Sequence, residues 1–349
     1  MKIIKTEISQ KKNKKIQKIK FLNDNNYSLE FFNFGGYFHS INVPYKYNTQ
    51  KTEDVILGYQ DFDEYLTDQI SLNALVGRVC GRIRNAKFVL NNKTYSLSNN
   101  DKSHHIHGGN EGFNKKLWKI ESLEENQDIL RCKLRYFSKH LEEGYPGNLD
   151  CKAVYSFNNA NELKIEYSAE CDQDTIVNLT NHNYWNFHGH NSHYKNILNH
   201  VLQIDAENVC ELNSEYIPSG NLKKVEKSKF DFRTIKNIDE NILSNDGIDI
   251  CYEINKEKKL KAVAKIYSNI TKMGMILYTD QPGLQFYTGN MMQNFYRGKY
   301  NKKYGYQFGL CMEAQLFPDA INHSNFISPV LKAGNTYSSK IIIKLKNDF

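Results

Sequence analysis

Apolar residues recur at every second position in segments spread along the whole chain, and no other feature constrains the fold as strongly. In a β-strand successive side chains point to opposite faces, so each such segment can bury one face of a sheet. Two clear segments place these residues in phase: Leu163, Ile165, Tyr167 and Ala169, then Leu260, Ala262, Ala264 and Ile266. The segment KIIIKLKN continues the pattern near the end of the chain. The alternation predicts an all-β protein.

Polar clusters separate these segments at the spacing of turns between short antiparallel strands. Examples are NNDKSHH, LNNKTY, FNNANEL and KAGNTY. Only short stretches such as DFDEYLTDQ, residues 61–69, favour a helix, and no alternation of helices with strands suggests a parallel sheet. We therefore expect a large antiparallel β-sandwich that forms a single domain over residues 1–349.

The positive charge of the chain lies in its first residues. The formal net charge is +7, and residues 1–20 hold eight lysines against one acidic residue, Glu7, so the remaining residues are neutral as a set. A lysine-rich arm can bind nucleic acid or an anionic surface, but lysines also protect the exposed edge of a sheet. We favour a solvated edge hairpin or a frayed terminus, and we expect no nucleic-acid partner.

The seven cysteines stand singly in the sequence, without a CxxC pair. This spacing argues against a disulfide framework or a zinc knuckle. The N-terminal residues MKIIKTEISQ contain no apolar stretch of signal-peptide length, and no apolar run is long enough to cross a bilayer. We expect a cytoplasmic protein without a membrane partner.

Two glycine-rich segments carry polar groups that a fold alone does not require. In GRVCGRIRN, Arg78 and Arg82 offer forked donors for hydroxyls or carboxylates, although a salt-bridged loop explains them equally well. In HHIHGG, His105 and His107 would share a strand face. Together with the later HGHNSH tract they could bind zinc, but a histidine held by a glycine turn and directed into a pocket is more economical. We expect no metal.

Two strand-like segments also carry unusual polar groups. In VNLTNHNYWNFHGH the polar face has Asn178, Thr180 and His182 in place of lysines and glutamates. In CMEAQLFPDA, Glu313 would share a face with Cys311. A carboxylate inside an apolar strand is costly unless it is paired or used, and burial can tune its pKa for acid–base work. A buried Glu–Arg pair is the structural alternative.

These segments together supply imidazole, carboxylate, guanidinium and amide groups. The chain contains no reactive-serine motif, phosphate-binding loop or dinucleotide fingerprint. The set suits general acid–base catalysis, without a cofactor, on a small polyhydroxylated molecule. A sugar ring presents C–H bonds to an aromatic plane and hydroxyls to polar groups, and Tyr184 and Trp185 stand close to His182 in the sequence.

An ordered series of motifs resembles that of the aldose 1-epimerase, or galactose mutarotase, family. The series is GRVCGRI, HHIHGGNEGFNKKLW, EEGYPGNL, VNLTNHNYWNF, GIDICY, DQPGLQFYTGN and CMEAQLFPDAINHSNF, and it runs from about Asn33 to Tyr337. The resemblance therefore covers nearly the whole chain. It implies a β-sandwich of the supersandwich type, no metal, and interconversion of the α and β anomers of free hexoses such as galactose and glucose.

The resemblance also implies roles for individual residues. Glu313 is similar to the general base that removes the proton of the anomeric hydroxyl, and His182 to the general acid that protonates the ring oxygen. His107 is similar to the histidine that assists at the ring oxygen. Two residues depart from the family pattern, because Gly81 and Trp185 stand where Asn and Phe are usual. The residues expected to contact the sugar are Arg82, Asp249, Gln281, Gly81, Tyr184 and Trp185.

Three other functions fit parts of the sequence. A glycoside hydrolase would pair Glu313 with a second carboxylate, Asp249 or Asp319, where we place His182. A non-catalytic carbohydrate-binding module can share the fold, but it would not need His182, His107 and Glu313 together. A hexose-6-phosphate epimerase would need Arg or Lys residues facing the pocket. We favour the mutarotase of free sugars, as a monomer or homodimer.

Overall fold

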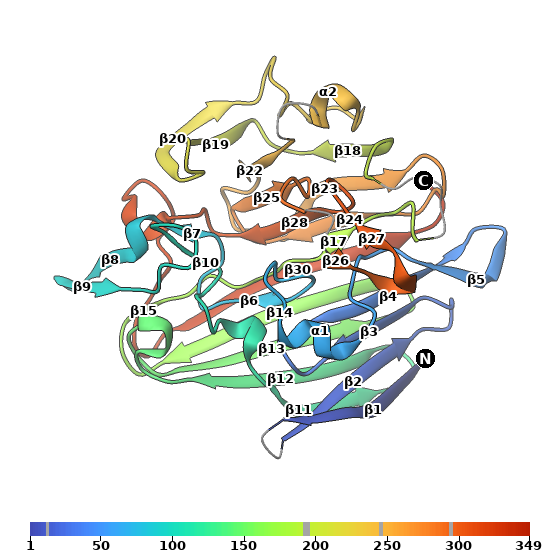
Figure 1. Cartoon of the computed structure of the whole chain (residues 1–349), viewed down its shortest axis with the longest axis horizontal. Helices are drawn as coiled ribbons and strands as arrows, with labels where there is room; N and C mark the ends of the chain where they lie inside the picture. The colour runs from blue at the N-terminus through green and yellow to red at the C-terminus, as the bar shows by residue number, and fades with distance from the viewer. Residues whose placement is uncertain (12–13, 191–195, 244–246, 293–295) are drawn as a thin grey trace.

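Antiparallel sheets make up most of the computed structural model, which describes residues 1–11, 14–190, 196–243, 247–292 and 296–349 (Figure 1). The first sheet has the order β1 (Lys2–Lys11), β2 (Lys14–Leu22), β3 (Ser28–Phe32), β4 (Phe38–Tyr45), β5 (Asn48–Asp54). The largest sheet has the order β11 (Lys119–Glu125), β12 (Leu130–Ser138), β13 (Leu149–Phe157), β14 (Glu162–Cys171), β30 (Thr336–Lys346), β24 (Gly274–Thr279), β23 (Lys261–Ser268), β18 (His200–Ile204), β21 (Lys236–Asn237). The third sheet has the order β17 (Tyr184–Trp185), β28 (Leu310–Gln315), β25 (Gly283–Tyr287), β22 (Asp249–Glu253), β19 (Asn208–Leu212), β20 (Pro218–Lys224).

Short strand pairs complete the β-structure. They join β6 (Leu75–Val76) to β16 (Thr180–Asn181), β7 (Arg82–Ile83) to β10 (His105–Ile106), β8 (Lys87–Leu90) to β9 (Lys93–Ser96), β15 (Thr175–Ile176) to β29 (Val330–Leu331), and β26 (Tyr296–Arg297) to β27 (Lys303–Tyr304). The α-helices among the described residues are α1 (Phe62–Leu66) and α2 (Glu240–Leu243). The first of them confirms the helical character predicted for residues 61–69. The backbone N–H of Asp61 donates to the Glu64 carboxylate at 3.0 Å, which stabilises the start of this helix.

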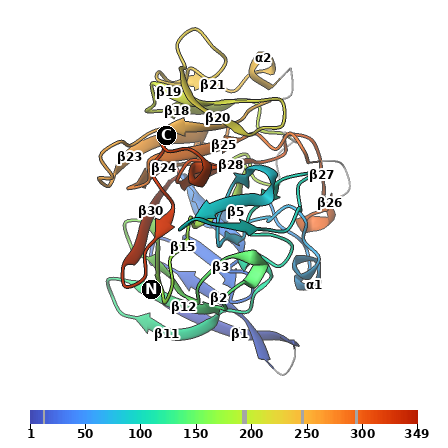
Figure 2. The same cartoon turned by 90° about the vertical axis from the view of Figure 1, so that its left-hand side faces the viewer.

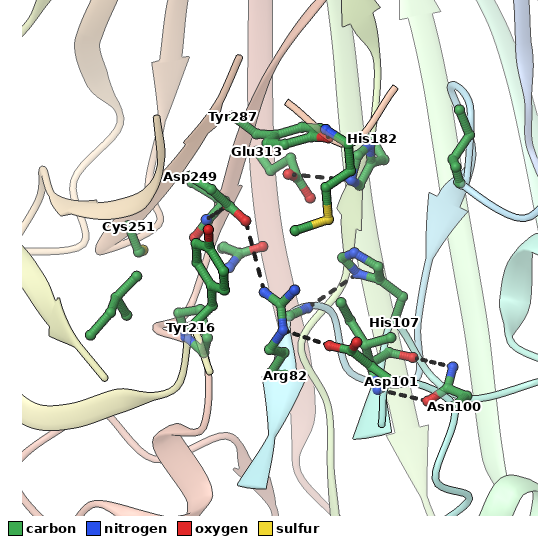
Figure 3. A pocket seen from close by; sticks show the side chains of 18 of the residues that line it. Arg82, Asn100, Asp101, His107, His182, Tyr216, Asp249, Cys251, Tyr287 and Glu313 are labelled. Carbon is green, nitrogen blue, oxygen red and sulfur yellow. Dashed lines mark hydrogen bonds and ion pairs between the residues drawn. The ribbon is translucent and has the colours of Figure 1, made fainter. Parts of the chain in front are cut away.

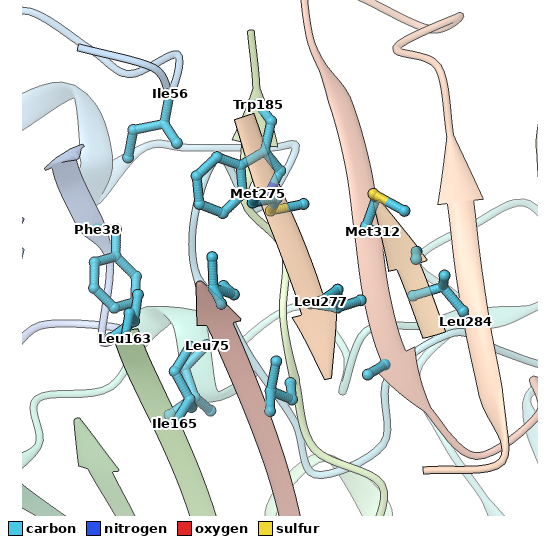
Figure 4. Close-up of a cluster of buried hydrophobic side chains, with 14 of the residues drawn as sticks. Phe38, Ile56, Leu75, Leu163, Ile165, Trp185, Met275, Leu277, Leu284 and Met312 are labelled. Atoms are coloured by element: carbon cyan, nitrogen blue, oxygen red, sulfur yellow. The ribbon is translucent and has the colours of Figure 1, made fainter. Parts of the chain in front are cut away.

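The largest sheet packs face to face against the other two, and the core lies between these layers. The ring of Tyr155 on β13 contacts Phe31 of β3 and Phe38 of β4, with centroid distances of 5.1 and 4.9 Å. Figure 4 shows Met275 and Leu277 of the largest sheet in the same buried cluster as residues of the third sheet. This cluster includes residues from Ile19 to Leu345. The layered arrangement, seen from the side in Figure 2, agrees with the predicted β-sandwich.

The alternation that predicted these strands holds on β14 and fails in part on β23. On β14 the residues Leu163 and Ile165 and their in-phase neighbours are buried, as predicted. On β23 the register shifts between Ala262 and Ala264, so Val263 and Ala264 are both buried while Ala262 is exposed. A β-bulge adds one residue to a strand and reverses the faces beyond it. The period-two pattern does not reveal such an insertion.

The lysine-rich N-terminal segment forms a hairpin at the edge of the first sheet (Figure 1). Strands β1 and β2 pair antiparallel, and Lys15 forms an exposed ion pair with Glu7 at 2.8 Å. This geometry matches the edge-hairpin interpretation; residues 12–13 lie outside the described residues. No helix in the described ranges is long and apolar enough to cross a lipid bilayer. The seven cysteines are all buried and free.

Candidate active site

A pocket of about 260 Å³ lies above strands β28, β25 and β22, where they meet the short β7–β10 pair (Figure 3). Its volume is near the lower end of the roughly 300–1,000 Å³ common for small-molecule sites. The pocket brings together residues that are far apart in the sequence. The sequence-predicted residues that line it are Gly81, Arg82, His107, His182, Tyr184, Asp249 and Glu313.

Strand β28 supplies the floor of the pocket. Glu313 and Gln315 line the pocket, whereas Met312 and Ala314 point into the core, as the alternation predicted. Glu313 is only 2% exposed, and its Oε2 atom has no hydrogen-bond partner in the structure. Burial raises the pKa of Glu313 well above its usual value, the nearby charge of Asp249 raises it further, and Arg82 opposes both effects. A buried carboxyl with a free oxygen in a pocket is suited to take up or release a proton.

His182 lies directly beside this carboxyl. Its Nε2 atom is 3.5 Å from Oε1 of Glu313. The rings of Tyr184 and His107 pack against the imidazole, each with a centroid distance of 5.1 Å. The backbone N–H of His182 donates to the carbonyl of Ala74 at 2.9 Å, which fixes the residue just beyond β16. Burial lowers the pKa of His182 to about 4.

The pKa values of Glu313 and His182 are shifted towards each other by burial, upward for the carboxyl and downward for the imidazole. Because burial disfavours the charged form of each group, the protonated carboxyl and the neutral imidazole are favoured in the free pocket. Hydrogen bonds from a sugar hydroxyl to Glu313 would favour its carboxylate and move the proton to His182. The pair can therefore pass one proton back and forth without a net change in charge.

His107 is held by a tight turn that requires glycine. Its backbone has a φ of 52°, and the N–H of Gly81 donates to its Nδ1 atom at 3.3 Å. This hydrogen bond leaves the proton of the neutral ring on Nε2, where it can be donated. Gly108, which follows, has a φ of 83°, and a Cβ atom there would lie 1.8 Å from the carbonyl oxygen of Gly77. Burial lowers the pKa of His107 well below its usual value, so the ring stays neutral.

Arg82 stands opposite Glu313 and is held by two carboxylates. Its Nε donates to Asp101 at 2.7 Å, and its guanidinium lies 3.9 Å from Asp249. Asp249 in turn accepts a hydrogen bond from the amide of Gln285 at 2.5 Å. Burial raises the pKa of Asp249, and Arg82 and Gln285 partly offset this. The group presents fixed donors and acceptors to the hydroxyls of a ligand.

Asp101 is expected to orient Arg82, and its replacement tests that role. In Asp101→Asn the acceptor becomes neutral, so the charge-assisted hydrogen bond to Arg82 weakens. We expect the KM for a sugar substrate to rise about tenfold, with a smaller change in kcat. Steady-state kinetics beside the exposed control Asp128→Asn will measure this. An unchanged KM would show that the charge of Asp101 is not needed to position the guanidinium.

Two predicted sugar contacts do not reach this pocket. Trp185 follows Tyr184 on β17 and therefore points to the opposite side, where it stacks on Phe187 in the core and is 1% exposed. Gln281 precedes β25, donates to Asp280 at 2.7 Å and lines a separate surface depression. The glutamine of the DQPGLQFYTGN segment that lines the pocket is Gln285, which pairs across the sheet with Glu313.

Several pocket residues were not anticipated from the sequence. Gln285 and Gln315 occupy inward positions of β25 and β28, so the alternation carried a usable signal for both. Gln315 is 1% exposed, and both polar atoms of its amide lack a partner. Asp101 and Tyr216 come from turns, and only the fold brings them to Arg82, whose guanidinium lies 5.5 Å from the centroid of the Tyr216 ring.

Two other polar residues of the glycine-rich segments have structural roles. Arg78 is 2% exposed and donates to the backbone carbonyls of Pro146 and Gly147 at 2.7 and 3.0 Å. His105 does not share a face with His107, because strand β10 ends at Ile106. Its ring contacts the Tyr145 hydroxyl at 2.6 Å, away from the pocket.

The polar residues of the VNLTNHNYWNFHGH segment have two kinds of role: His182 lines the pocket, and others hold the neighbouring strand in place. Asn178 accepts from the Leu316 N–H at 2.9 Å, and Thr180 donates to the Ala314 carbonyl at 3.0 Å, so both hold β28 in place. His188 and His190 are buried away from the pocket, and His193 of the same histidine tract lies outside the described residues. Within the described ranges, no three His, Cys, Asp or Glu side chains gather as metal ligands would.

Comparison of the sequence with known proteins identifies the family of the chain. A model described as aldose 1-epimerase matches residues 17–344. The chain belongs to the aldose 1-epimerase family. This family member is 35% identical to galactose mutarotase of Bos taurus over 291 residues, which is 82% of each chain. It is 34% identical to aldose 1-epimerase of Haemophilus influenzae over 340 residues, covering 95% of this chain and 96% of the relative.

Solved structures are similar to this aldose 1-epimerase family member in fold. An aldose epimerase homologue from C. elegans has a TM-score of 0.86 and 24% identity, covering 95% of this chain and 99% of that chain. Galactose 1-epimerase from Lactobacillus acidophilus has the same TM-score and identity, covering 100% of this chain and 99% of that chain. These likenesses confirm the predicted all-β sandwich of the galactose mutarotase-like, supersandwich kind.

Proposed function

We propose that this protein is an isomerase that interconverts the α and β anomers of free aldohexoses such as galactose and glucose. The observation that carries the proposal is the Glu313–His182 pair, 3.5 Å apart at the floor of a pocket lined by fixed polar groups. Such a pair can remove one proton from a sugar and add another in the same step. Membership of the aldose 1-epimerase family supports the same conclusion.

Ring opening needs one proton to leave the sugar and one to arrive. The Glu313 carboxylate accepts the proton of the anomeric C1 hydroxyl while protonated His182 gives its proton to the ring oxygen, and the bond between C1 and that oxygen breaks. Rotation about the C1–C2 bond turns the other face of the aldehyde towards the new hydroxyl. On closure His182 takes the hydroxyl proton back and Glu313 returns its proton to the carbonyl oxygen. No proton is lost or gained overall.

The remaining pocket residues bind the sugar and stabilise developing charge. The Nε2–H of His107 donates towards the ring oxygen or a neighbouring hydroxyl, consistent with the hydrogen bond from Gly81 to its other nitrogen. Arg82 and Asp249 supply a donor and an acceptor for ring hydroxyls. Tyr184 forms part of the wall, and Gly81 leaves room beside Pro318, from which a Cβ atom would be 3.1 Å away.

The pH dependence of kcat/KM follows from the shifted pKa values of the pair. Below about pH 4 His182 also takes up a proton, so Glu313 cannot act as a base. Above the raised pKa of Glu313 the pair loses its one proton and has no acid. We therefore expect the rate measured by polarimetry to stay level through mildly acidic pH and to fall only as the pH drops through about 4. A fall centred near the usual imidazole value of about 6.5 would contradict these shifts.

The structure gives less support to the alternative functions. A hexose 6-phosphate would need cationic side chains for its phosphate, and Arg82 is the one Lys or Arg among the described residues of the pocket. Asp319, a possible second carboxylate of a hydrolase, does not line the pocket and accepts from the Arg84 N–H at 3.0 Å. Asp249 does line it, but is engaged by Arg82 and Gln285. A binding module would not need the paired acid and base.

We further propose that the chain acts as a single domain, as a monomer or homodimer in the cytoplasm, with the free sugar and no nucleic acid as its partner. The family match over residues 17–344 and the shared core support one domain. The seven free cysteines suit a reducing compartment. The excess positive charge is confined to residues 1–20. Size-exclusion chromatography with light scattering distinguishes the two oligomeric states.

Polarimetry tests the proposed activity. Protein is added to freshly dissolved α-D-glucose or α-D-galactose, and the optical rotation is followed to equilibrium. We expect faster relaxation than in buffer, in proportion to protein concentration. No acceleration with either hexose, or with arabinose or xylose, would overturn the proposal. Release of nitrophenol from nitrophenyl glycosides would instead indicate a hydrolase.

A further inference from the structure

Strand β28 contacts both nitrogens of the His182 ring. Glu313 lies 3.5 Å from Nε2, and the sulfur of Cys311, two residues earlier on the same strand face, lies 3.4 Å from Nδ1. Both contacts are buried, and Cys311 is fully excluded from solvent. Cys311 does not line the pocket. The thiol therefore lies behind the ring, where it can act on His182 but not on a sugar.

We propose that Cys311 is a positioning residue whose sulfur accepts the Nδ1–H of His182 and so keeps Nε2 as the nitrogen that exchanges a proton. The inference rests on the proposed function, in which His182 gives its Nε2 proton to the ring oxygen and takes it back. For this cycle the neutral ring must carry its remaining proton on Nδ1. An acceptor fixed at Nδ1 selects that tautomer, since the hydrogen bond on one ring nitrogen decides which nitrogen is protonated.

A sulfur acceptor at Nδ1, in place of an oxygen acceptor, affects how readily protonated His182 releases its proton. Burial raises the pKa of the Cys311 thiol well above its usual value, and the charges of Glu313 and Asp249 add to this, so the thiol stays neutral. A neutral thiol sulfur is a weak acceptor. It orients the ring but stabilises the imidazolium little, so protonated His182 remains a strong acid towards the ring oxygen. A carboxylate or carbonyl at this position would hold the proton more tightly.

Among the described side chains, Cys311 is the one with a contact to Nδ1, and the backbone of His182 itself also forms a hydrogen bond with the ring that raises its pKa. The ring of Tyr184 stacks on the face of the His182 ring, and the ring of His107 stands perpendicular to it. The carboxyl of Glu313 lies at Nε2 and lines the pocket. Cys311 of β28 contacts His182 from behind the pocket. The titratable and charged groups that line the described pocket are Glu313 from β28, His107 after β10, His182 after β16, Tyr184 from β17, Tyr287 from β25, Arg82 from β7, Asp249 and Cys251 from β22, and Asp101 and Tyr216 from turns.

Two substitutions separate this role from simple packing. In Cys311→Ser the oxygen is a stronger acceptor, so the pKa of His182 rises, and we expect the acid limb of kcat/KM to move up by about one pH unit. In Cys311→Ala the acceptor is lost, and we expect kcat to fall about tenfold while KM changes less than about twofold. Cys171→Ser, a buried thiol on β14 outside the pocket, serves as the control. Wild-type kcat and pH profiles in both Cys311 variants would overturn the proposal.

The tautomer of His182 can be read without any activity. In protein labelled with ¹⁵N histidine, with the His182 signals assigned by their loss in His182→Asn, we expect Nδ1 protonated and Nε2 unprotonated near neutral pH. The Nε2–H form should increase in Cys311→Ala and not in Cys171→Ser. Nε2–H as the main form in wild type would contradict the proposal. If wild type fails to accelerate mutarotation but shows the expected tautomer, the proposed function fails and the positioning role of Cys311 stands.

Discussion

Replacement of Glu313 by glutamine is expected to lower kcat for mutarotation about a thousandfold, within the 10²–10⁴ range for a positioned acid–base group. The amide fills the same space on β28 and can still hydrogen-bond a hydroxyl, but it cannot take the proton of the C1 hydroxyl. Oε2 of the buried carboxyl has no hydrogen-bond partner, so the one contact that the change alters is that of Oε1 with His182. Sugar binding, measured by calorimetry, should change less than about threefold.

The matched control is Glu226→Gln, which changes the same side chain at an exposed position that does not line the pocket. It should retain wild-type kcat and KM. If Glu313→Gln turns over like wild type, Glu313 is not the base. If it instead loses sugar binding with kcat unchanged, Glu313 serves only as a binding group.

Replacement of His182 by asparagine should lower kcat about a hundredfold to a thousandfold. Asparagine preserves a hydrogen-bonding group near the ring oxygen but cannot transfer a proton to it at neutral pH. The loss of the imidazole also removes the ring contact with Tyr184, so a modest rise in KM is expected as well. The fall of kcat/KM near pH 4 should disappear, because it reports the pKa of His182.

The exposed His140→Asn variant is the control for this change. The double variant Glu313→Gln with His182→Asn provides a sharper comparison. Groups that act in one step lose their effect together, so the double variant should be little slower than the slower single variant. Fully multiplicative losses would indicate that the two residues act in separate steps.

The sequence predicted the sheet structure and the centre of the site because both depend on local alternation and on motif order. The in-phase residues of β14 and the inward position of Glu313 on β28 follow directly from a period of two. The pairing of Glu313 with His182 came from a family resemblance, and the 3.5 Å contact between them agrees with it. The alternation alone did not indicate that these two segments would meet.

The parts that the sequence did not predict depend on irregular backbone and on contacts between distant segments. Trp185 and Gln281 were expected in the pocket, but the direction of a two-residue strand and the start of β25 place both elsewhere. The bulge on β23 shifts the register of the strand, and the alternation of apolar residues in the sequence does not show where the shift occurs. Asp101 and Tyr216 reach Arg82 only through the folding of two turns.

Exchange NMR on galactose at anomeric equilibrium tests the central claim most directly. The H1 signals of the α and β anomers are resolved, and magnetisation passes between them only if the ring opens and closes during the mixing time. We predict exchange between the two signals with wild-type protein near neutral pH, and exchange at the level of buffer with Glu313→Gln. No exchange with wild-type protein, or equal exchange with Glu313→Gln, would contradict ring opening by the Glu313–His182 pair.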